Sequence, residues 1–192
     1  YNFYCVCINP CYVSLAKQFL EGSDVKVATV VGFPLGANTS SNKLEECIES
    51  IENGASEIDF VINIGQLKSA NFTYVEDEIN SLAKACHDRA AILKVIIETA
   101  LLTEEEIVKV SKICCEQNAD FIKTSTGFST RGASISDIKL IKKTIVSSGK
   151  SLKIKASGGI RDVDFALALI DAGADRLGAS SGVKIIEEFK SM

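Results

Sequence analysis

The chain has 192 residues, 46% of them hydrophobic, and a formal net charge of -4. This is enough apolar material for one sizeable core but hardly for two, so we expect a single domain over residues 1–192. The acidic balance provides no basic stripe for neutralising phosphates, which disfavours a general nucleic-acid-binding protein.

Apolar runs rich in Val and Ile alternate with amphipathic helical patterns along the whole chain. The hydrophobicity of these runs is nearly continuous, which is typical of parallel strands buried on both faces. The predicted strands are Phe3–Ile8, Lys26–Phe33, Glu57–Asn63, Leu93–Glu98, Asp120–Thr124, Leu152–Ala156 and Arg176–Gly178.

Local signals mark the ends of several predicted helices. Thr103 and Glu106 form a capping box that opens an amphipathic helix, and Ser134 and Asp162 are suited to cap two others. Other helical patterns are followed by glycine, which adopts the left-handed conformation of a C-terminal cap at little cost. These glycines are Gly54, Gly149 and Gly173.

The repeated βα unit predicts the fold class. A repeat of about 25 residues implies either an open doubly wound sheet or a closed (β/α)8 TIM barrel. Uniform element lengths, the absence of a G-x-G-x-x-G turn and polar residues after most strands favour the barrel. Because seven strands are found and Phe3 enters a strand almost at once, we expect these residues to form strands two to eight, with the first βα unit absent from this sequence.

Two lysines occupy matching places in neighbouring predicted strands. Lys123 and Lys155 each lie in an apolar run that leads into glycine, so both should point towards the carboxyl end of the sheet. A buried ammonium is costly, and a second one nearby raises the cost, so both pressures favour a neutral amine. A neutral lysine amine attacks aldehydes and ketones, and the pattern therefore suggests Schiff-base chemistry. A lysine that merely reaches solvent at the rim is the alternative.

Two further side chains are candidates for the same site. Asp59 lies inside an apolar strand, where a carboxylate needs a cationic partner. We expect it to face the two lysines and to relay protons through water, with a structural ion pair as the alternative. Cys7 ends the first apolar run and is placed near the substrate only if it is accessible, since most such cysteines are small buried hydrophobes.

Three glycine-containing turns follow the last three predicted strands. Glycine allows the backbone to approach a ligand closely, and exposed N–H groups at helix starts bind phosphate oxygens. In barrels the loops after the last two strands commonly form such a site. The turns predict a phosphorylated small substrate bound by Gly127, Gly158, Gly159, Gly178, Ser180 and Ser181.

Cysteine and histidine usage disfavours a metal site. The seven cysteines lack metal-ligand spacing and only one histidine, His87, accompanies them, so we expect no catalytic metal. An odd number of cysteines without a disulfide framework indicates a reducing, cytoplasmic setting. No run approaches the ~20 apolar residues of a membrane span, and nothing at the start resembles a signal peptide, so we expect no membrane association.

Seven runs resemble the deoxyribose-phosphate aldolase family, whose members are class I aldolases with a TIM-barrel fold. They occur in the family's order and cover nearly the whole chain, and Lys-Thr-Ser-Thr-Gly followed by Lys-Ala-x-Gly-Gly is highly specific. The runs are Val6–Pro10, Val31–Gly36, Glu57–Gly65, Leu93–Thr99, Phe121–Gly127, Lys155–Arg161 and Gly178–Gly182.

The resemblance implies a role for each catalytic candidate. Lys123 would form the Schiff base, Lys155 would keep Lys123 neutral and assist proton transfer, and Asp59 would act with them through a bound water. Gly158, Gly159, Ser180 and Ser181 would hold the phosphate. The reaction would be the reversible cleavage of 2-deoxy-D-ribose 5-phosphate to D-glyceraldehyde 3-phosphate and acetaldehyde, without cofactor or metal, in deoxynucleoside and carbohydrate catabolism.

The sequence departs from the family pattern in one place and leaves other functions open. The family's first strand carries an Asp-His-Thr motif that has no counterpart here. Another Schiff-base aldolase of phosphorylated sugars, resembling transaldolase, is the first alternative. A non-catalytic barrel that binds sugar phosphates is the second, because phosphate turns need no reactive lysine. Self-association into a homo-oligomer is compatible with each of these.

Overall fold

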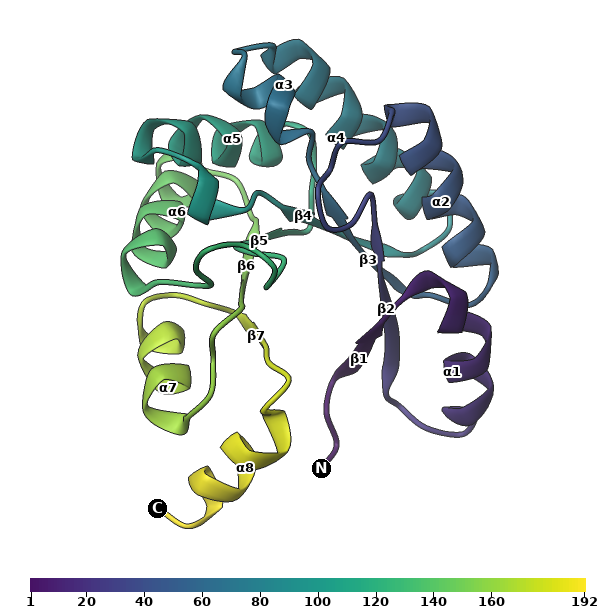
Figure 1. The fold of residues 1–192 in the computed structure, drawn as a ribbon, viewed down its shortest axis with the longest axis vertical. Coiled ribbons are helices and arrows are strands. Elements are labelled where there is room, and N and C mark those ends of the chain that lie inside the picture. The colour runs from purple at the N-terminus through teal and green to yellow at the C-terminus, as the bar shows by residue number, and fades with distance from the viewer. The chain divides into compact units, whose positions relative to one another are not determined.

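A computed structural model describes residues 1–192 and shows strands and helices alternating along the chain (Figure 1). Seven strands are present, as the sequence predicts. They are β1 (Cys5–Ile8), β2 (Lys26–Val31), β3 (Glu57–Val61), β4 (Ile92–Ile96), β5 (Phe121–Lys123), β6 (Lys153–Ser157) and β7 (Arg176–Gly178).

A helix follows every strand. The α-helices are α1 (Val13–Phe19), α2 (Ser40–Glu52), α3 (Ile64–Lys68), α4 (Phe72–His87), α5 (Glu104–Glu116), α6 (Ile135–Ser148), α7 (Val163–Asp171) and α8 (Gly182–Lys190). Two single turns of 3-10 helix precede α1 and α5, η1 (Pro10–Tyr12) and η2 (Thr99–Leu101). None of these helices is long and apolar enough to cross a membrane.

The strand order decides between the two predicted architectures. The strands are neighbours in sequence order, from β1 to β7. The pairs β1–β2, β2–β3, β5–β6 and β6–β7 are all parallel. A doubly wound sheet reverses its strand order at a switch point, whereas a barrel adds each new strand beside the last. The fold is therefore α/β of the TIM-barrel class, as predicted.

Several strands end earlier than the apolar pattern suggests. The predicted strand over Glu57–Asn63 stops at Val61, because Asn63 leaves the strand to cap α3 and its Oδ1 accepts a hydrogen bond from Gln66 N at 3.1 Å. The predicted strand ending at Glu98 stops at Ile96, because Glu98 adopts a left-handed conformation with φ of 52°. Asn63 and Glu98 therefore belong to the turns that follow β3 and β4.

Contact density divides the chain into two compact units. One comprises Tyr1 with Ile96–Glu116 and Phe121–Met192, and we call it the lysine unit because it contains Lys123 and Lys155. The other comprises Asn2–Val95 with Gln117–Asp120, and we call it the carboxylate unit because it contains Asp59. Each unit is described by itself, and a single domain over residues 1–192 stays a prediction.

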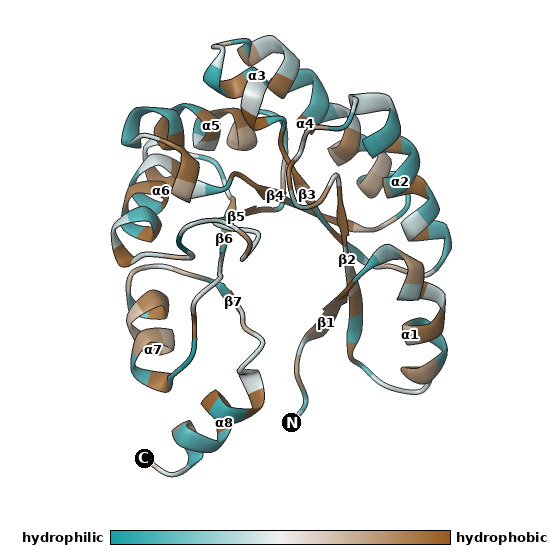
Figure 2. Ribbon diagram, in the orientation of Figure 1, coloured by the Kyte–Doolittle hydropathy of each residue, from teal (hydrophilic) through white to brown (hydrophobic).

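In both units the strands carry mostly hydrophobic residues, whereas the helices mix hydrophobic and hydrophilic ones (Figure 2). The buried core consists largely of Val, Ile, Leu and Ala side chains from strands and from one face of each long helix. Such burial contributes roughly 25 cal/mol per Å² of apolar surface removed from water. The seven cysteines are free thiols, four of them buried.

A buried ion pair fixes the carboxyl end of β3 in the carboxylate unit. Lys43 Nζ lies 2.8 Å from Glu78 Oε1 and also donates to Val61 O at 2.8 Å. Glu78 Oε2 accepts from Asn63 N at 2.9 Å, so α2 and α4 are both tied to the same strand end. Burial lowers the pKa of Lys43, and the Glu78 carboxylate opposes that shift. Gly32 leaves the space that the Lys43 stem needs, because a Cβ there would lie 2.8 Å from Lys43 Cε.

The predicted helix caps of the lysine unit are present. Ser134 Oγ and Asp162 Oδ1 each accept a hydrogen bond from the backbone N–H three residues later, at 3.1 and 2.8 Å. Thr103 and Glu106 exchange the two reciprocal bonds of a capping box, at 2.8 and 3.2 Å. Gly149 ends α6 in the left-handed conformation. Local chemistry therefore sets where these helices begin and end.

Candidate active site

The two lysines of the lysine unit lie opposite each other on neighbouring strands. Lys123 of β5 is paired in register with Lys155 of β6. Paired residues of parallel strands point to the same face and lie ~4.8 Å apart. The two residues are only 5% and 3% exposed, so two amines share a mostly desolvated space. The structure therefore places the two lysines side by side in a mostly buried setting.

A glycine on the next strand makes room for Lys155. A Cβ built on Gly178 would lie 3.1 Å from Lys155 Cε and 3.2 Å from Ser157 Cβ, tighter than ordinary van der Waals contact. Because Ser157 is the register partner of Gly178, the Lys155 side chain runs towards the carboxyl end of β7. The lack of a side chain at Gly178 therefore leaves space for Lys155. This role is additional to the place predicted for Gly178 in the phosphate site.

More cations occupy the same face of β5, β6 and β7. Arg176 is paired in register with Lys155, which extends the row of Lys123 and Lys155 to a third strand. Its guanidinium carbon lies 4.7 Å from the centre of the Phe121 ring, and Lys153 Nζ lies 5.7 Å from it. Phe121 therefore provides cation–π contacts beneath the two lysines, and the positive charges around them disfavour one another.

The turn after β6 contains two glycines in the left-handed region. Gly158 and Gly159 both have positive φ, 85° and 77°, a conformation that glycine adopts at no steric cost. Gly132 of the β5–α6 loop lies so close that its Cβ, if present, would be 2.0 Å from Gly158 O. Ala133 N donates to Ser157 O at 3.0 Å and to Gly158 O at 3.1 Å, so the loop packs directly onto this turn.

Buried hydroxyls join the strand ends beneath this turn. Thr124 Oγ1 donates to Ser157 O at 3.2 Å, and Ser125 Oγ donates to Thr124 Oγ1 at 3.0 Å. Ser157 Oγ donates to Ser125 O at 2.8 Å. A serine at position 157 therefore finds a partner for its buried hydroxyl, and it stabilises the junction between β5 and β6.

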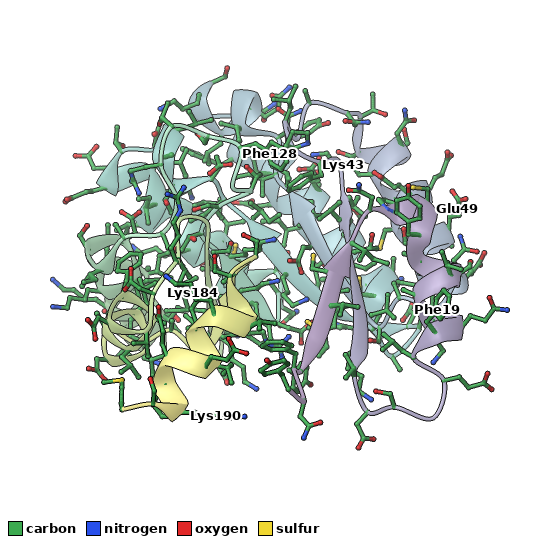
Figure 3. The ribbon with its side chains drawn as sticks, turned by 60° about the horizontal axis from the view of Figure 1, so that its bottom comes forward. Phe19, Lys43, Glu49, Phe128, Lys184 and Lys190 are labelled. Atoms are coloured by element: carbon green, nitrogen blue, oxygen red, sulfur yellow. The ribbon has the colours of Figure 1, made fainter.

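The start of α8 supplies the second predicted phosphate element. Ser180 is exposed, and Ser181 occupies the N-cap position without using its side chain as a cap. Lys184 of α8 donates to Arg161 O at 3.1 Å (Figure 3). Glu188 Oε2 accepts from Val163 N at 3.1 Å. These two bonds tie the start of α7 to the first and last turns of α8.

Asp59 lies in the carboxylate unit and is paired with a lysine that the sequence reasoning missed. Lys94 Nζ is 2.7 Å from Asp59 Oδ1 and 2.6 Å from Glu57 Oε2, and all three side chains are fully or almost fully buried. A lysine in the middle of the apolar run Leu93–Ile97 was the available signal. The relation of Asp59 to Lys123 and Lys155 stays a prediction.

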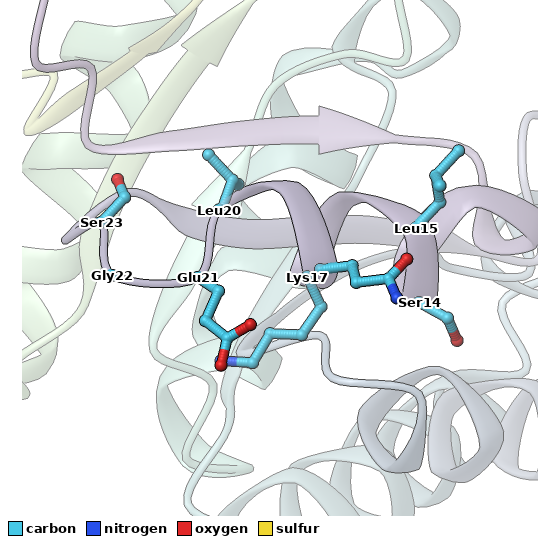
Figure 4. Close-up of a pocket in the computed structure, with 8 residues that line it drawn as sticks. Ser14, Leu15, Lys17, Leu20, Glu21, Gly22 and Ser23 are labelled. Atoms are coloured by element: carbon cyan, nitrogen blue, oxygen red, sulfur yellow. The ribbon is translucent and has the colours of Figure 1, made fainter.

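Cys7, a surface hollow and the absence of a metal cluster bear on the remaining predictions. Cys7 is exposed on β1 and its thiol is free, so it meets the accessibility condition, while a place near the substrate stays a prediction. An open hollow along α1 has Lys17 and Glu21 pointing towards each other and contains none of the predicted site residues (Figure 4). No group of three or more His, Cys, Asp or Glu side chains could hold a metal ion.

Comparisons with known proteins agree with these observations. Residues 2–188 match the profile of the DeoC/LacD family aldolases. The chain is 52% identical over 191 residues to the deoxyribose-phosphate aldolase of Caldanaerobacter subterraneus subsp. tengcongensis, covering 99% of this chain and 81% of the relative. A solved aldolase called QR15 is 46% identical, with a TM-score of 0.91 over 98% of this chain and 82% of its own.

A third comparison is with the solved deoxyribose phosphate aldolase of Aeropyrum pernix, whose structure is described as tetrameric. It is 33% identical, with a TM-score of 0.90 over 98% of this chain and 78% of its own. Parallel strands in sequential order, each followed by a helix, define the barrel class of α/β proteins. Within that class, the chain belongs to the DeoC/LacD aldolase family.

Proposed function

We propose that this chain is a deoxyribose-phosphate aldolase that cleaves 2-deoxy-D-ribose 5-phosphate reversibly through a Schiff base on Lys123. The observation that carries the proposal is the pairing of two buried lysines in register beside glycine turns. Relatives that are about 50% identical to this chain over nearly its whole length are named deoxyribose-phosphate aldolases. This similarity supports the same substrate for this chain.

The proposed reaction begins when the neutral Lys123 amine attacks the sugar aldehyde. Loss of water gives an imine, which withdraws electrons from the neighbouring carbons. Removal of the proton from the hydroxyl on C3 then breaks the C2–C3 bond and releases D-glyceraldehyde 3-phosphate. The electron pair of that bond forms the C1=C2 double bond of an enamine on the Lys123 nitrogen. Protonation at C2 restores an imine, which water hydrolyses to acetaldehyde and the free lysine. Lys155 and Asp59 are proposed to transfer these protons.

We propose that the substrate phosphate is held at the carboxyl ends of β6 and β7. Backbone N–H groups of Gly158 and Gly159 and the start of α8 at Ser181 supply donors and a favourable helix dipole. Gly127 and Ser180 complete the set. No step of this chemistry calls for a metal or an organic cofactor.

Replacing Ser181 with aspartate tests the phosphate site. The added carboxylate should repel the phosphate, so the KM for the phosphorylated sugar should rise by about 10-fold or more, while activity on 2-deoxyribose changes much less. Steady-state kinetics with both sugars gives the comparison, and Ser191→Asp at the far end of α8 is the matched control. Equal losses for both sugars would contradict the assignment.

Product analysis separates the proposed function from the two alternatives. The purified protein with EDTA should convert 2-deoxy-D-ribose 5-phosphate to acetaldehyde and D-glyceraldehyde 3-phosphate, and should form the sugar phosphate from the two products. A transaldolase-like enzyme would transfer a larger ketone fragment instead. A non-catalytic sugar-phosphate-binding barrel would bind the substrate and release no acetaldehyde, which would overturn the proposal.

The setting of the enzyme is also a proposal. Seven free thiols suit a reducing cytoplasm, and a small phosphorylated sugar suits a role in deoxyribonucleotide catabolism. We propose a homo-oligomer, because the Aeropyrum pernix relative is described as tetrameric.

A further inference from the structure

The β5–α6 loop connects the proposed Schiff-base lysine with the proposed phosphate site. It begins directly after Lys123, and its far end packs on the turn at Gly158 through Gly132. Thr99 N donates to Thr124 O at 2.9 Å, which joins the start of the loop to the segment that follows β4. That segment, Glu98–Thr99, contacts the loop at two more points.

The first contact is a carboxylate clamp. Glu98 Oε2 accepts a hydrogen bond from Thr126 N at 3.1 Å and a very short one from the Thr126 hydroxyl. The same hydroxyl oxygen accepts from Phe128 N at 3.1 Å, which closes a tight turn around Gly127. Gly127 has φ of 92° in this turn. Through Thr126, Glu98 is therefore hydrogen-bonded to the turn that contains Gly127.

The second contact holds the far side of the loop. The Arg131 guanidinium donates to both carboxylate oxygens of Asp137 and to Thr99 O, the latter at 3.0 Å. Between these two contacts, Phe128 at the loop tip is 77% exposed. The loop is thus attached to the segment after β4 on both sides of its tip, and its far end packs on the Gly158 turn.

Glu98 itself is held in an unusual state. The residue is 2% exposed and has a left-handed backbone, which is uncommon for a residue other than glycine, asparagine or aspartate. Its Oε1 atom is buried and has no hydrogen-bond partner in the protein. Buried polar atoms nearly always have a hydrogen-bond partner, and strained backbone is concentrated at functional sites. The left-handed backbone of Glu98 and its buried Oε1 atom therefore indicate a local function that outweighs their cost to stability.

We propose that Glu98 is a positioning residue that, through the Thr126 hydroxyl, fixes the Gly127 turn and so sets the affinity for the substrate phosphate. This inference rests on the proposed function, because it assumes that phosphate binds beside Gly127 and Gly158. Glu98 acts through the loop and does not touch the reacting carbon atoms. Its loss should therefore weaken phosphate binding and leave imine formation on Lys123 intact.

The Thr126→Val substitution tests the clamp, because valine has nearly the same shape as threonine and carries a methyl group in place of the hydroxyl. The KM for 2-deoxy-D-ribose 5-phosphate should rise about 10-fold, the effect of one charge-assisted hydrogen bond. The kcat and the KM for unphosphorylated 2-deoxyribose should stay within about twofold. Thr126→Ser should restore the wild-type KM, and Thr130→Val in the same loop is the matched control.

A measurement without turnover keeps this inference separate from the proposed function. Calorimetry with inorganic phosphate should show the same tenfold weakening in Thr126→Val, whether or not the wild type cleaves the sugar. Wild-type protein that binds phosphate but releases no acetaldehyde would overturn the proposed function alone. Unchanged KM in an active Thr126→Val enzyme, or equal losses for both sugars, would overturn the clamp. A fall in melting temperature with unchanged phosphate affinity would likewise reduce Glu98 to a structural role.

Discussion

Replacing Lys123 with leucine should abolish aldol cleavage, with a loss of about four orders of magnitude or more, the scale seen when a covalent nucleophile is removed. No other group can then form the imine that withdraws electrons from the bond to be broken. The measurement is the initial rate of acetaldehyde release from 2-deoxy-D-ribose 5-phosphate. Circular dichroism should show that the variant remains folded.

Two further variants separate nucleophilicity from charge. Lys123→Arg should be equally inactive, because a guanidinium keeps the positive charge and does not lose its proton in proteins. Lys155→Leu should retain slow cleavage, since Lys123 is still present but has lost the neighbouring cation and proton donor. Substantial activity in Lys123→Leu, or a more complete loss in Lys155→Leu, would reverse the two roles.

Among these substitutions, replacing Lys94 with methionine should lower the free energy of unfolding the most. Lys94 Nζ lies within 2.7 Å of carboxylate oxygens from both Glu57 and Asp59, and the three side chains are buried. Removing one partner of a buried ionic cluster leaves charge that its surroundings no longer compensate, which costs about 3–5 kcal/mol of the free energy of unfolding. Denaturation in urea measures the change.

The matched control for this prediction is Lys26→Met, which removes an exposed lysine from the start of β2. Its effect should stay within about 0.5 kcal/mol, as for most surface substitutions. If Lys94→Met lowered the free energy of unfolding no more than Lys26→Met, the prediction would be contradicted, because the buried cluster around Asp59 would not depend on Lys94 for its stability.

The sequence predicts the strands, the caps and the pairing of the lysines because each depends on local patterns. Apolar runs identify all seven strands, and Ser134 and Asp162 mark the starts of α6 and α7 through their own hydrogen bonds. Lys123 and Lys155 each lie near the end of an apolar run that leads into a glycine turn on adjacent strands, and the structure pairs them in register. Such features need no knowledge of the rest of the fold.

The features that escape prediction depend on contacts between distant segments. That Asp59 contacts Lys94 follows from how β3 and β4 pack, and a lysine within an apolar run does not name its partner. The proposed roles of Glu98 and Thr126 depend on a left-handed turn after β4 and on a hydrogen bond between residues that lie 28 positions apart in the chain. Periodicity carries no information about either contact.

The most direct test of the account is to find which lysine forms the imine. Wild-type protein treated with acetaldehyde and borohydride should gain one ethyl group, because reduction converts the imine to a stable secondary amine. Peptide mapping by mass spectrometry should place it on Lys123, and Lys123→Leu should show no specific labelling. An adduct on Lys155, or unchanged specific labelling in Lys123→Leu, would contradict the proposed mechanism.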